Sequence, residues 1–283
     1  MAVVHHKQIR LGDLEVFYRE AGPKDAPAVL LPHGYPCSSY EFRNLMARLG
    51  DRFRLLAPDF PGCGYSATPE DFDYSFGGFA RFLGEFAGAV GVEDFDLYLH
   101  DFGTWIGLRM AMAAPERVRG LIIQNGDIYE DQLGPDYEGL KAYWDDPTPE
   151  RKAGLAEAIN EAGYRKEFLN GSDQVADRVS PDLWRLHWSL TTPRRQAINL
   201  EVIASLKENR DWFVRYQAFL REHRPPTLIV WGPNDGYMPA GAARAYLRDL
   251  PGAQLHLFED GGHWLLETHL NEVEPLIRGF LSR

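Results

Sequence analysis

The chain has 283 residues, of which 45% are hydrophobic and 13% aromatic, enough to bury the core of one large domain or of a domain with an inserted lid. Its formal net charge of -11 disfavours a nucleic-acid partner, because proteins bind polyanions through clustered Lys and Arg side chains. No apolar stretch reaches the length that a bilayer-spanning helix needs, so we do not expect a membrane protein.

Cysteine usage and the first residues bear on the cellular compartment. The two cysteines, Cys37 and Cys63, are too few for a disulfide framework in a chain of this length. The opening segment, MAVVHHKQIR, lacks the apolar core of a signal peptide. We therefore expect a reduced, cytoplasmic protein. No cluster of Cys, His and carboxylate residues has the spacing of metal ligands, and we expect neither a metal nor another cofactor.

Short segments rich in Val, Ile and Leu alternate with longer segments of helical period. Strands are predicted at residues 14–22, 28–34, 53–59, 95–101, 118–125, 226–232 and 253–260. Helices are predicted at residues 41–50, 76–91, 104–115, 240–250 and 269–283. This alternation is typical of parallel strands joined by crossover helices. We therefore predict an α/β protein with a mostly parallel central sheet and helices on both faces.

The alternation breaks once, between about Tyr129 and Arg224. There the strand pattern disappears, and the sequence becomes helical, punctuated by Pro and rich in Tyr, Trp and Phe. The simplest explanation is an all-helical insertion after the sixth central strand, which would form a cap. We predict a core domain of residues 1–128 and 225–283 and a helical cap domain of residues 129–224.

The segment LYLHDFGTWIG places Asp101 between a predicted strand and a predicted helix, with Gly103 allowing a tight turn. This arrangement resembles the nucleophile elbow G-x-S-x-G, with Asp in place of Ser and Leu99 at a position usually given to a small residue. A carboxylate is already ionised at neutral pH and needs no base to activate it. The alternative is that Asp101 only caps the helix, which is a common use of Asp.

A second segment, LLPHGYPCSSYEFRNLM, also lies between a strand and a helix. Gly34 beside Pro36 would fix a turn in which the backbone N–H of Tyr35 points into the site. Together with the N–H of Phe102 it would form an oxyanion hole. The alternative is an ordinary Gly-Pro loop.

Two late segments supply an acid and a histidine. Asp235 lies in a turn after the next-to-last strand, and His263 lies in a glycine-lined loop after the last strand. Nucleophile, acid and histidine then stand in the chain order of the α/β-hydrolase triad, at the strand ends where ligands collect in open α/β sheets. A structural role is expected by default for six other histidines, namely His5, His6, His187, His223, His256 and His269.

Over nearly its whole length the sequence resembles the α/β-hydrolase superfamily, and within it the branch with an aspartate nucleophile, the epoxide hydrolases and haloalkane dehalogenases. The motifs that carry this resemblance are HGYPCSSYEFRNLM, APDFPGCGYS, LYLHDFGTWIG, WGPNDGYMP and GGHW, in the order of that branch. The resemblance implies that Asp101 attacks a substrate carbon to form an alkyl ester. His263, oriented by Asp235, would then activate the water that hydrolyses the ester.

Epoxide hydrolases and haloalkane dehalogenases differ in the leaving group, which is an alkoxide or a halide. The sequence departs from the usual residue pattern of each class. Haloalkane dehalogenases usually place Trp directly after the nucleophile and often Asn after the HG pair, where this chain has Phe102 and Tyr35. Fluoroacetate dehalogenases carry arginines just after the nucleophile, where this chain has Phe102 and Trp105, which disfavours a carboxylate substrate. Epoxide hydrolases use two tyrosines of the cap, one early and one late in its sequence. Tyr143 fits the early position. No tyrosine stands at the late position, so Tyr216 or Tyr164 would have to replace it, unless both are core aromatic residues.

We therefore predict an epoxide hydrolase acting on small, neutral, largely apolar substrates with water, as a monomer or homodimer, with Tyr143 as the proton donor. The alternatives are a dehalogenase using Tyr35 or Trp144 in an unusual halide site, and a non-catalytic receptor that binds a small molecule under its cap. A serine esterase is disfavoured because no Ser stands at the elbow. The candidate substrate-binding residues are His33, Trp105, Trp144, Tyr216 and Trp264.

Overall fold

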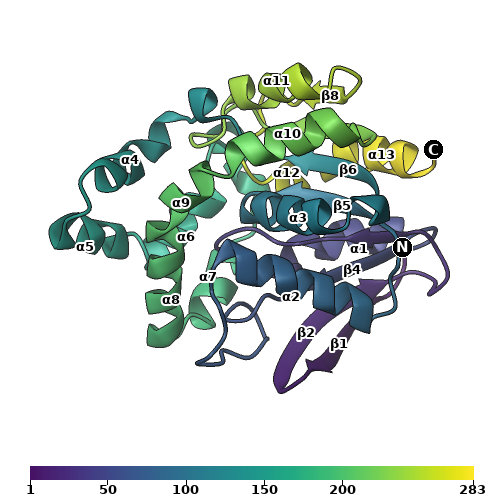
Figure 1. Cartoon of the computed structure of the whole chain (residues 1–283), viewed down its shortest axis with the longest axis horizontal. Coiled ribbons are helices and arrows are strands. Elements are labelled where there is room, and N and C mark those ends of the chain that lie inside the picture. The colour runs from purple at the N-terminus through teal and green to yellow at the C-terminus, as the bar shows by residue number, and fades with distance from the viewer.

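The computed structural model describes residues 1–283, arranged around one eight-stranded sheet of order β1-β2-β4-β3-β5-β6-β7-β8 (Figure 1). The strands are β1 (Val4–Leu11), β2 (Leu14–Ala21), β3 (Ala28–Leu30), β4 (Arg54–Pro58), β5 (Phe95–His100), β6 (Val118–Gln124), β7 (Thr227–Trp231) and β8 (Gln254–Leu257). β2 pairs antiparallel with β1 and β4, and all other neighbours pair in parallel. The predicted α/β class with a mostly parallel sheet is confirmed.

All seven predicted strands are present, and the structure adds β1, which the sequence pattern missed. β1 lies at the edge of the sheet, and most of its side chains are exposed or only partly buried. An edge strand of this kind needs no apolar run, because it packs against little more than its one partner. Its sequence, VHHKQIRL, therefore lacks the pattern from which the inner strands were predicted.

The helices follow the predicted alternation outside the insertion. They are α1 (Arg43–Leu49), α2 (Phe76–Ala89), α3 (Phe102–Ala113), α11 (Ala240–Asp249), α12 (Leu265–Thr268) and α13 (Leu270–Leu281), with the short 3-10 helices η1 (Ser39–Phe42) and η2 (Pro115–Arg117). One apolar cluster joins the sheet to α2, α3 and α11, and a second joins it to α1 and α13. The helices therefore cover both faces of the sheet, as predicted.

Between β6 and β7 the chain forms helices only. These are η3 (Glu130–Gln132), η4 (Pro135–Tyr137), α4 (Glu138–Asp145), α5 (Pro149–Glu157), α6 (Glu161–Phe168), η5 (Asp173–Arg178), α7 (Asp182–Ser189), α8 (Pro193–Ala204), α9 (Leu206–Arg210) and α10 (Phe213–His223). Figure 1 shows α4 to α9 gathered at one end of the molecule, whereas α10 lies beside α3 and α11. The division into core and cap at residues 129 and 224 stays a proposal.

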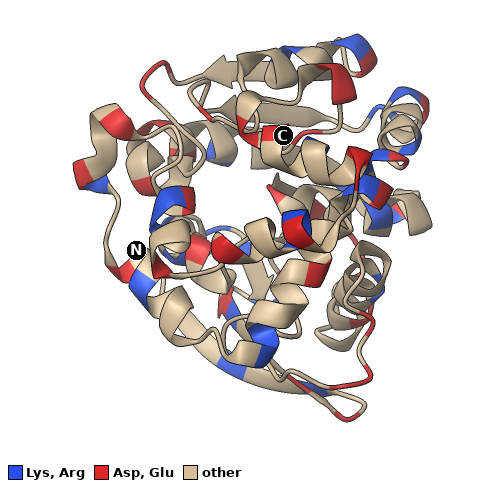
Figure 2. Ribbon diagram, turned by 90° about the vertical axis from the view of Figure 1, so that its left-hand side faces the viewer, with Lys and Arg blue, Asp and Glu red and all other residues tan.

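No helix combines the length and the apolar character that crossing a bilayer requires. Figure 2 shows Lys and Arg interspersed with Asp and Glu on the side of the molecule that it presents, rather than collected into one patch.

Candidate active site

Asp101 occupies a sharp turn between β5 and α3. Its backbone has φ 49° and ψ -129°, in a region that non-glycine residues rarely adopt and that is often found at functional sites. Its side chain makes no capping hydrogen bond to α3, so the structure does not support the capping explanation. A Cβ atom on Gly34 would lie 2.5 Å from the Cβ of Asp101, which shows that a glycine is needed for the loop after β3 to approach the turn.

The Asp101 carboxylate is held by the backbone of that loop. The N–H of Tyr35 donates a hydrogen bond of 2.6 Å to Oδ1 of Asp101. Burial raises the pKa of Asp101, against the opposing effects of the His263 and His100 charges and of the hydrogen bond from the Tyr35 N–H. The N–H of Tyr35, one of the two groups predicted to form an oxyanion hole, therefore contacts this carboxylate.

His263 lies between two carboxylates, as the triad prediction requires. Its Nε2 is 3.6 Å from Oδ2 of Asp101, and its Nδ1 donates to Oδ2 of Asp235 over 2.6 Å. Burial lowers the pKa of His263, but the charges of Asp235 and Asp101 outweigh burial and raise it to about 9. For Asp235, burial raises the pKa, and the contacts with His263 and Asn125 more than offset burial, so that the pKa falls below its usual value.

Two asparagines that the sequence analysis missed complete this arrangement. Asn125 follows β6 directly; its Nδ2 donates to Oδ2 of Asp235 over 2.9 Å, and its carbonyl accepts the N–H of Asp101 over 3.1 Å. Asn170, in the insertion, donates from Nδ2 to Oδ1 of Asp235 over 3.2 Å. The position of Asn125 at a strand end was a usable sequence indication, whereas nothing in the sequence around Asn170 singles it out.

A cavity of about 60 Å³ lies beside the elbow. Its wall from the core includes Tyr35 and Phe102, and its wall from the insertion includes Tyr164 and Asn199. The predicted substrate-binding residue His33 also lines this cavity. Both of its ring nitrogens are engaged by backbone, however, because Nε2 accepts the N–H of Phe60 over 3.1 Å and Nδ1 donates to the carbonyl of Gly34 over 3.0 Å. The His33 ring therefore supports the wall and has no free nitrogen to offer a ligand.

The other predicted substrate-binding residues, and the predicted donor Tyr143, do not line this cavity. The indole N–H of Trp105 donates to the carbonyl of Asp127 over 2.7 Å, and that of Trp264 donates to the carbonyl of Glu167 over 2.9 Å. Trp144 is buried, and its indole N–H has no partner. Asp101 and His263 do not line this cavity either, so the wall of the cavity decides neither the substrate-binding residues nor the donor Tyr143, and these stay predictions.

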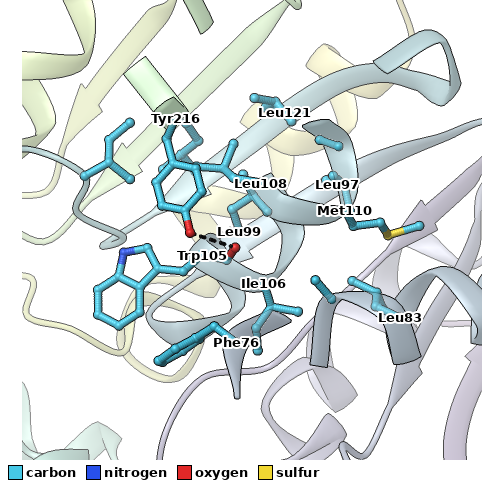
Figure 3. Close-up of a cluster of buried hydrophobic side chains, with 14 of the residues drawn as sticks. Phe76, Leu83, Leu97, Leu99, Trp105, Ile106, Leu108, Met110, Leu121 and Tyr216 are labelled. Carbon is cyan, nitrogen blue, oxygen red and sulfur yellow. Dashed lines mark hydrogen bonds between the residues drawn. The ribbon is translucent and has the colours of Figure 1, made fainter. Parts of the chain in front are cut away.

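Tyr216 packs in the hydrophobic core. Figure 3 shows its hydroxyl joined to the backbone carbonyl of Trp105, within a cluster of apolar side chains. Arg109 also donates to this hydroxyl, over 2.8 Å, and the hydroxyl in turn donates to Oδ1 of Asn209 over 3.1 Å. Tyr143 lies on α4, partly buried against the same apolar cluster. The structure therefore brings neither tyrosine to the cavity.

Tyr164, which the sequence left open as a replacement donor, does line the cavity. Its hydroxyl accepts a hydrogen bond of 3.1 Å from Nδ2 of Asn199 and lies 3.0 Å from Oγ1 of Thr191. The Thr191 hydroxyl donates to the carbonyl of His187, so the Tyr164 hydroxyl is the donor of the Tyr164–Thr191 pair. Burial raises the pKa of Tyr164 to about 12, so it carries its proton at neutral pH.

Comparison with known proteins identifies the family of the chain. A family model described as the alpha/beta hydrolase fold matches residues 27–270. An uncharacterized hydrolase of Saccharomyces cerevisiae is 33% identical over 287 residues, which cover 99% of this chain and 98% of that protein. A haloalkane dehalogenase of Mesorhizobium japonicum is 39% identical over 97% of this chain and 90% of its own length.

Among solved structures, the epoxide hydrolase CorEH superposes with a TM-score of 0.78 at 20% identity, and the match covers 99% of each chain. At that identity the likeness concerns the fold. The family model and the two sequence relatives each extend over most of the chain. The chain is a hydrolase and belongs to the α/β-hydrolase fold family.

Proposed function

We propose that this hydrolase opens neutral epoxides to vicinal diols through a covalent ester on Asp101. The observation that carries the proposal is the composition of the cavity wall, which includes Tyr35 and Tyr164 and no tryptophan. The alkoxide formed when an epoxide opens must gain a proton, and a tyrosine hydroxyl can supply it. A halide leaves without a proton and is stabilised instead by weak donors such as indole N–H groups, which this wall lacks.

In the first step, Oδ2 of Asp101 attacks an epoxide carbon, and the carbon–oxygen bond of the ring breaks. Oδ2 is the attacking atom because Oδ1 is occupied by the N–H of Tyr35. The released alkoxide takes the proton of the Tyr164 hydroxyl, which can turn from Thr191 towards the substrate. Asn199, which donates to the same hydroxyl oxygen, stabilises the resulting phenolate.

In the second step, the ester no longer carries the negative charge of Asp101. One of the charges that raise the pKa of His263 is thereby removed, so the imidazole releases its proton more readily. That proton restores the phenolate of Tyr164 through water. Neutral His263 then deprotonates the water that attacks the carbonyl carbon of Asp101.

The oxyanion of this second step forms on Oδ1, which already accepts the N–H of Tyr35, and the N–H of Phe102 is the second proposed donor. One such donor typically contributes about 3 kcal/mol to transition-state stabilisation. Collapse of the intermediate breaks the ester bond, and the diol oxygen takes the proton held by His263. The carboxylic acid left on Asp101 then gives its proton to His263, which restores the carboxylate and the imidazolium of the resting enzyme. The water has then been added across the epoxide, and Asp101 is regenerated.

Haloalkane dehalogenation is the second candidate, because the Mesorhizobium japonicum relative carries that name. Position 102 holds Phe, which offers no side-chain N–H, and the indoles of Trp105 and Trp264 already donate to backbone carbonyls. The indole of Trp144 is unpartnered but does not line the cavity. A halide site would therefore depend on Tyr35 and Tyr164.

One experiment separates the two candidates. The purified enzyme is incubated in parallel with styrene oxide and with 1-bromobutane, and the diol and the released bromide are quantified. The Asp101→Ala variant serves as the control for non-enzymatic opening. We expect diol formation that requires Asp101 and little bromide. Efficient bromide release, with no diol from any of a panel of epoxides, would replace the epoxide hydrolase proposal by the dehalogenase.

A further inference from the structure

We infer that Asn170, which lies in the helical insertion, is a positioning residue for both Asp235 and His263. The insertion then forms part of the catalytic apparatus, in addition to covering the substrate. The inference rests on the triad roles proposed above. It concerns how the acid and the base are held, and so applies whether the leaving group is an alkoxide or a halide.

Asn170 follows α6 and contacts the loops after β7 and β8 together. Its Nδ2 donates to Oδ1 of Asp235 over 3.2 Å, and its Oδ1 accepts the N–H of Gly236 over 3.0 Å. Its backbone carbonyl accepts the N–H of His263 over 3.0 Å. One residue of the insertion therefore bonds to the side chain of the acid and to the backbone of the base.

The neighbours of Asn170 hold it against these loops. The carbonyl of Glu167 accepts the indole N–H of Trp264 over 2.9 Å, and its Oε1 accepts the hydroxyl of Tyr237 over 3.1 Å. Gly171 has a φ of +66°, and a Cβ there would lie 2.8 Å from the backbone nitrogen of Asp235. Residues 167–171, here called the docking segment, are thus in direct contact with the residues next to both Asp235 and His263.

The hydrogen bonds of Asp235 show why Asn170 matters for its orientation. Oδ2 of this fully buried carboxylate contacts His263 and Asn125. Oδ1 accepts from the backbone N–H groups of Tyr237 and Met238, which belong to the same turn as Asp235, and from Asn170. Asn170 is therefore the one donor to Oδ1 that comes from another part of the chain.

This geometry has a specific kinetic consequence. In the proposed mechanism, the attack of Asp101 on the substrate does not require His263 as a base, whereas hydrolysis of the ester does. Loss of the Asn170 side chain removes the one donor that ties Oδ1 of Asp235 to another part of the chain, so that Asp235 shifts with its own turn and the imidazole shifts with it. Misplacement of a catalytic group by about 1 Å can cost a factor of about 10² in rate, so we expect ester hydrolysis to slow by about tenfold or more, and ester formation to change little.

The test compares Asn170→Ala with Asn160→Ala, which changes the other end of the same helix. Asn160 caps α6 by accepting the N–H of Gly163 over 2.9 Å, and it is exposed and has no contact with the triad. The Asn160→Ala variant therefore shows how a weakened α6 by itself affects the triad. A third variant, Asn170→Asp, keeps the acceptor for Gly236 but replaces the donor to Asp235 by a carboxylate oxygen. If only the Gly236 contact mattered, Asn170→Asp would behave like the parent.

The first measurement is independent of any substrate. The proton shared by Nδ1 of His263 and Asp235 over 2.6 Å should give a low-field proton resonance in NMR spectra, assigned by its loss in His263→Gln. We expect this resonance to shift or broaden in Asn170→Ala and Asn170→Asp and to be retained in Asn160→Ala. An unchanged resonance in both Asn170 variants, or an equal change in Asn160→Ala, overturns the inference.

The second measurement follows the ester during turnover of styrene oxide or 1-bromobutane, by rapid quenching and mass spectrometry of the peptide that contains Asp101. We expect the ester to accumulate in both Asn170 variants and not in Asn160→Ala. If kcat falls without ester accumulation, Asn170 does not act through the histidine. If the parent converts neither substrate, the proposed function fails, and the NMR comparison still decides the role of Asn170.

Discussion

The backbone N–H of Tyr35 donates a hydrogen bond of 2.6 Å to Oδ1 of Asp101, while Oδ2 of the same carboxylate faces Nε2 of His263 at 3.6 Å. The two carboxylate oxygens therefore have different surroundings before any substrate binds. In the proposed mechanism, Oδ2 forms the bond to carbon and Oδ1 becomes the ester carbonyl oxygen. The same backbone N–H then stabilises the carboxylate at rest and the oxyanion during hydrolysis, with no movement of the loop after β3.

Replacing Asp101 by Ala should abolish turnover and leave the fold intact. No other group of the site can form the ester. Asp101 makes no capping bond to α3, but Ala leaves the Tyr35 N–H without its acceptor, which costs about 1–3 kcal/mol, so the variant should fold with a lower thermal midpoint. Steady-state activity tests the loss of turnover, and the thermal midpoint of unfolding tests whether the fold is intact. Activity within tenfold of the parent would contradict the nucleophile assignment, and a folded, inactive variant would support it.

Replacing His263 by Gln should stop the reaction after its first step. Gln cannot take a proton from water, whereas ester formation depends on Asp101 and on a proton donor for the leaving group. We expect a stable mass increase on the peptide containing Asp101 after incubation with substrate. The Asp101→Ala variant is the matched control and should show no adduct. An absence of adduct in His263→Gln would argue against a covalent mechanism.

Replacing Tyr164 by Phe should lower epoxide turnover by about tenfold or more, the lower part of the range for general-acid contributions. Turnover of a bromoalkane, whose leaving group needs no proton, should change much less. Tyr143→Phe is the control, because Tyr143 does not line the cavity and should behave like the parent with both substrates. Full epoxide activity in Tyr164→Phe, with a loss in Tyr143→Phe, would return the donor role to the early cap tyrosine.

Asp127 should make the protein less stable as the pH rises, and Asp127→Asn should remove that dependence. Burial, with the charges of Asp235 and Asp101, raises the pKa of Asp127 to about 8, and its Oδ2 has no hydrogen-bond partner. In the unfolded chain the pKa is about 4. Between these values the native state holds a proton that the unfolded state lacks, so the free energy of unfolding falls as pH increases.

The measurement for Asp127 is the thermal midpoint of parent and variant at pH 5 and at pH 8.5. Groups that do not interact with Asp127 titrate alike in both proteins, so their contributions cancel in the difference. The variant minus parent difference should increase with pH, since Asn cannot lose a proton. A difference that is the same at both pH values would show that Asp127 titrates near its usual pKa.

The inner strands and the positions of Asp101, Asp235 and His263 could be predicted because both depend on local sequence. The predicted strands contain short apolar runs, and Asp101, Asp235 and His263 lie in glycine-containing turns after β5, β7 and β8. Parallel strands bring their carboxyl ends to one edge, so residues far apart in the chain were expected to meet there. The fold of the core and the gathering of the three residues follow from that rule.

The lining of the cavity and the role of Asn170 were decided by tertiary structure alone. Tyr143, Tyr164 and Tyr216 all lie in amphipathic helices of the insertion. The helical spacing of apolar residues is the same whether a side chain packs in the core or lines a cavity. Which tyrosine faces the cavity depends on how each helix is rotated and packed against its neighbours. Asn170 acquires its contacts only because the end of α6 lies against two loops from distant parts of the chain, and no local property of the sequence encodes that meeting.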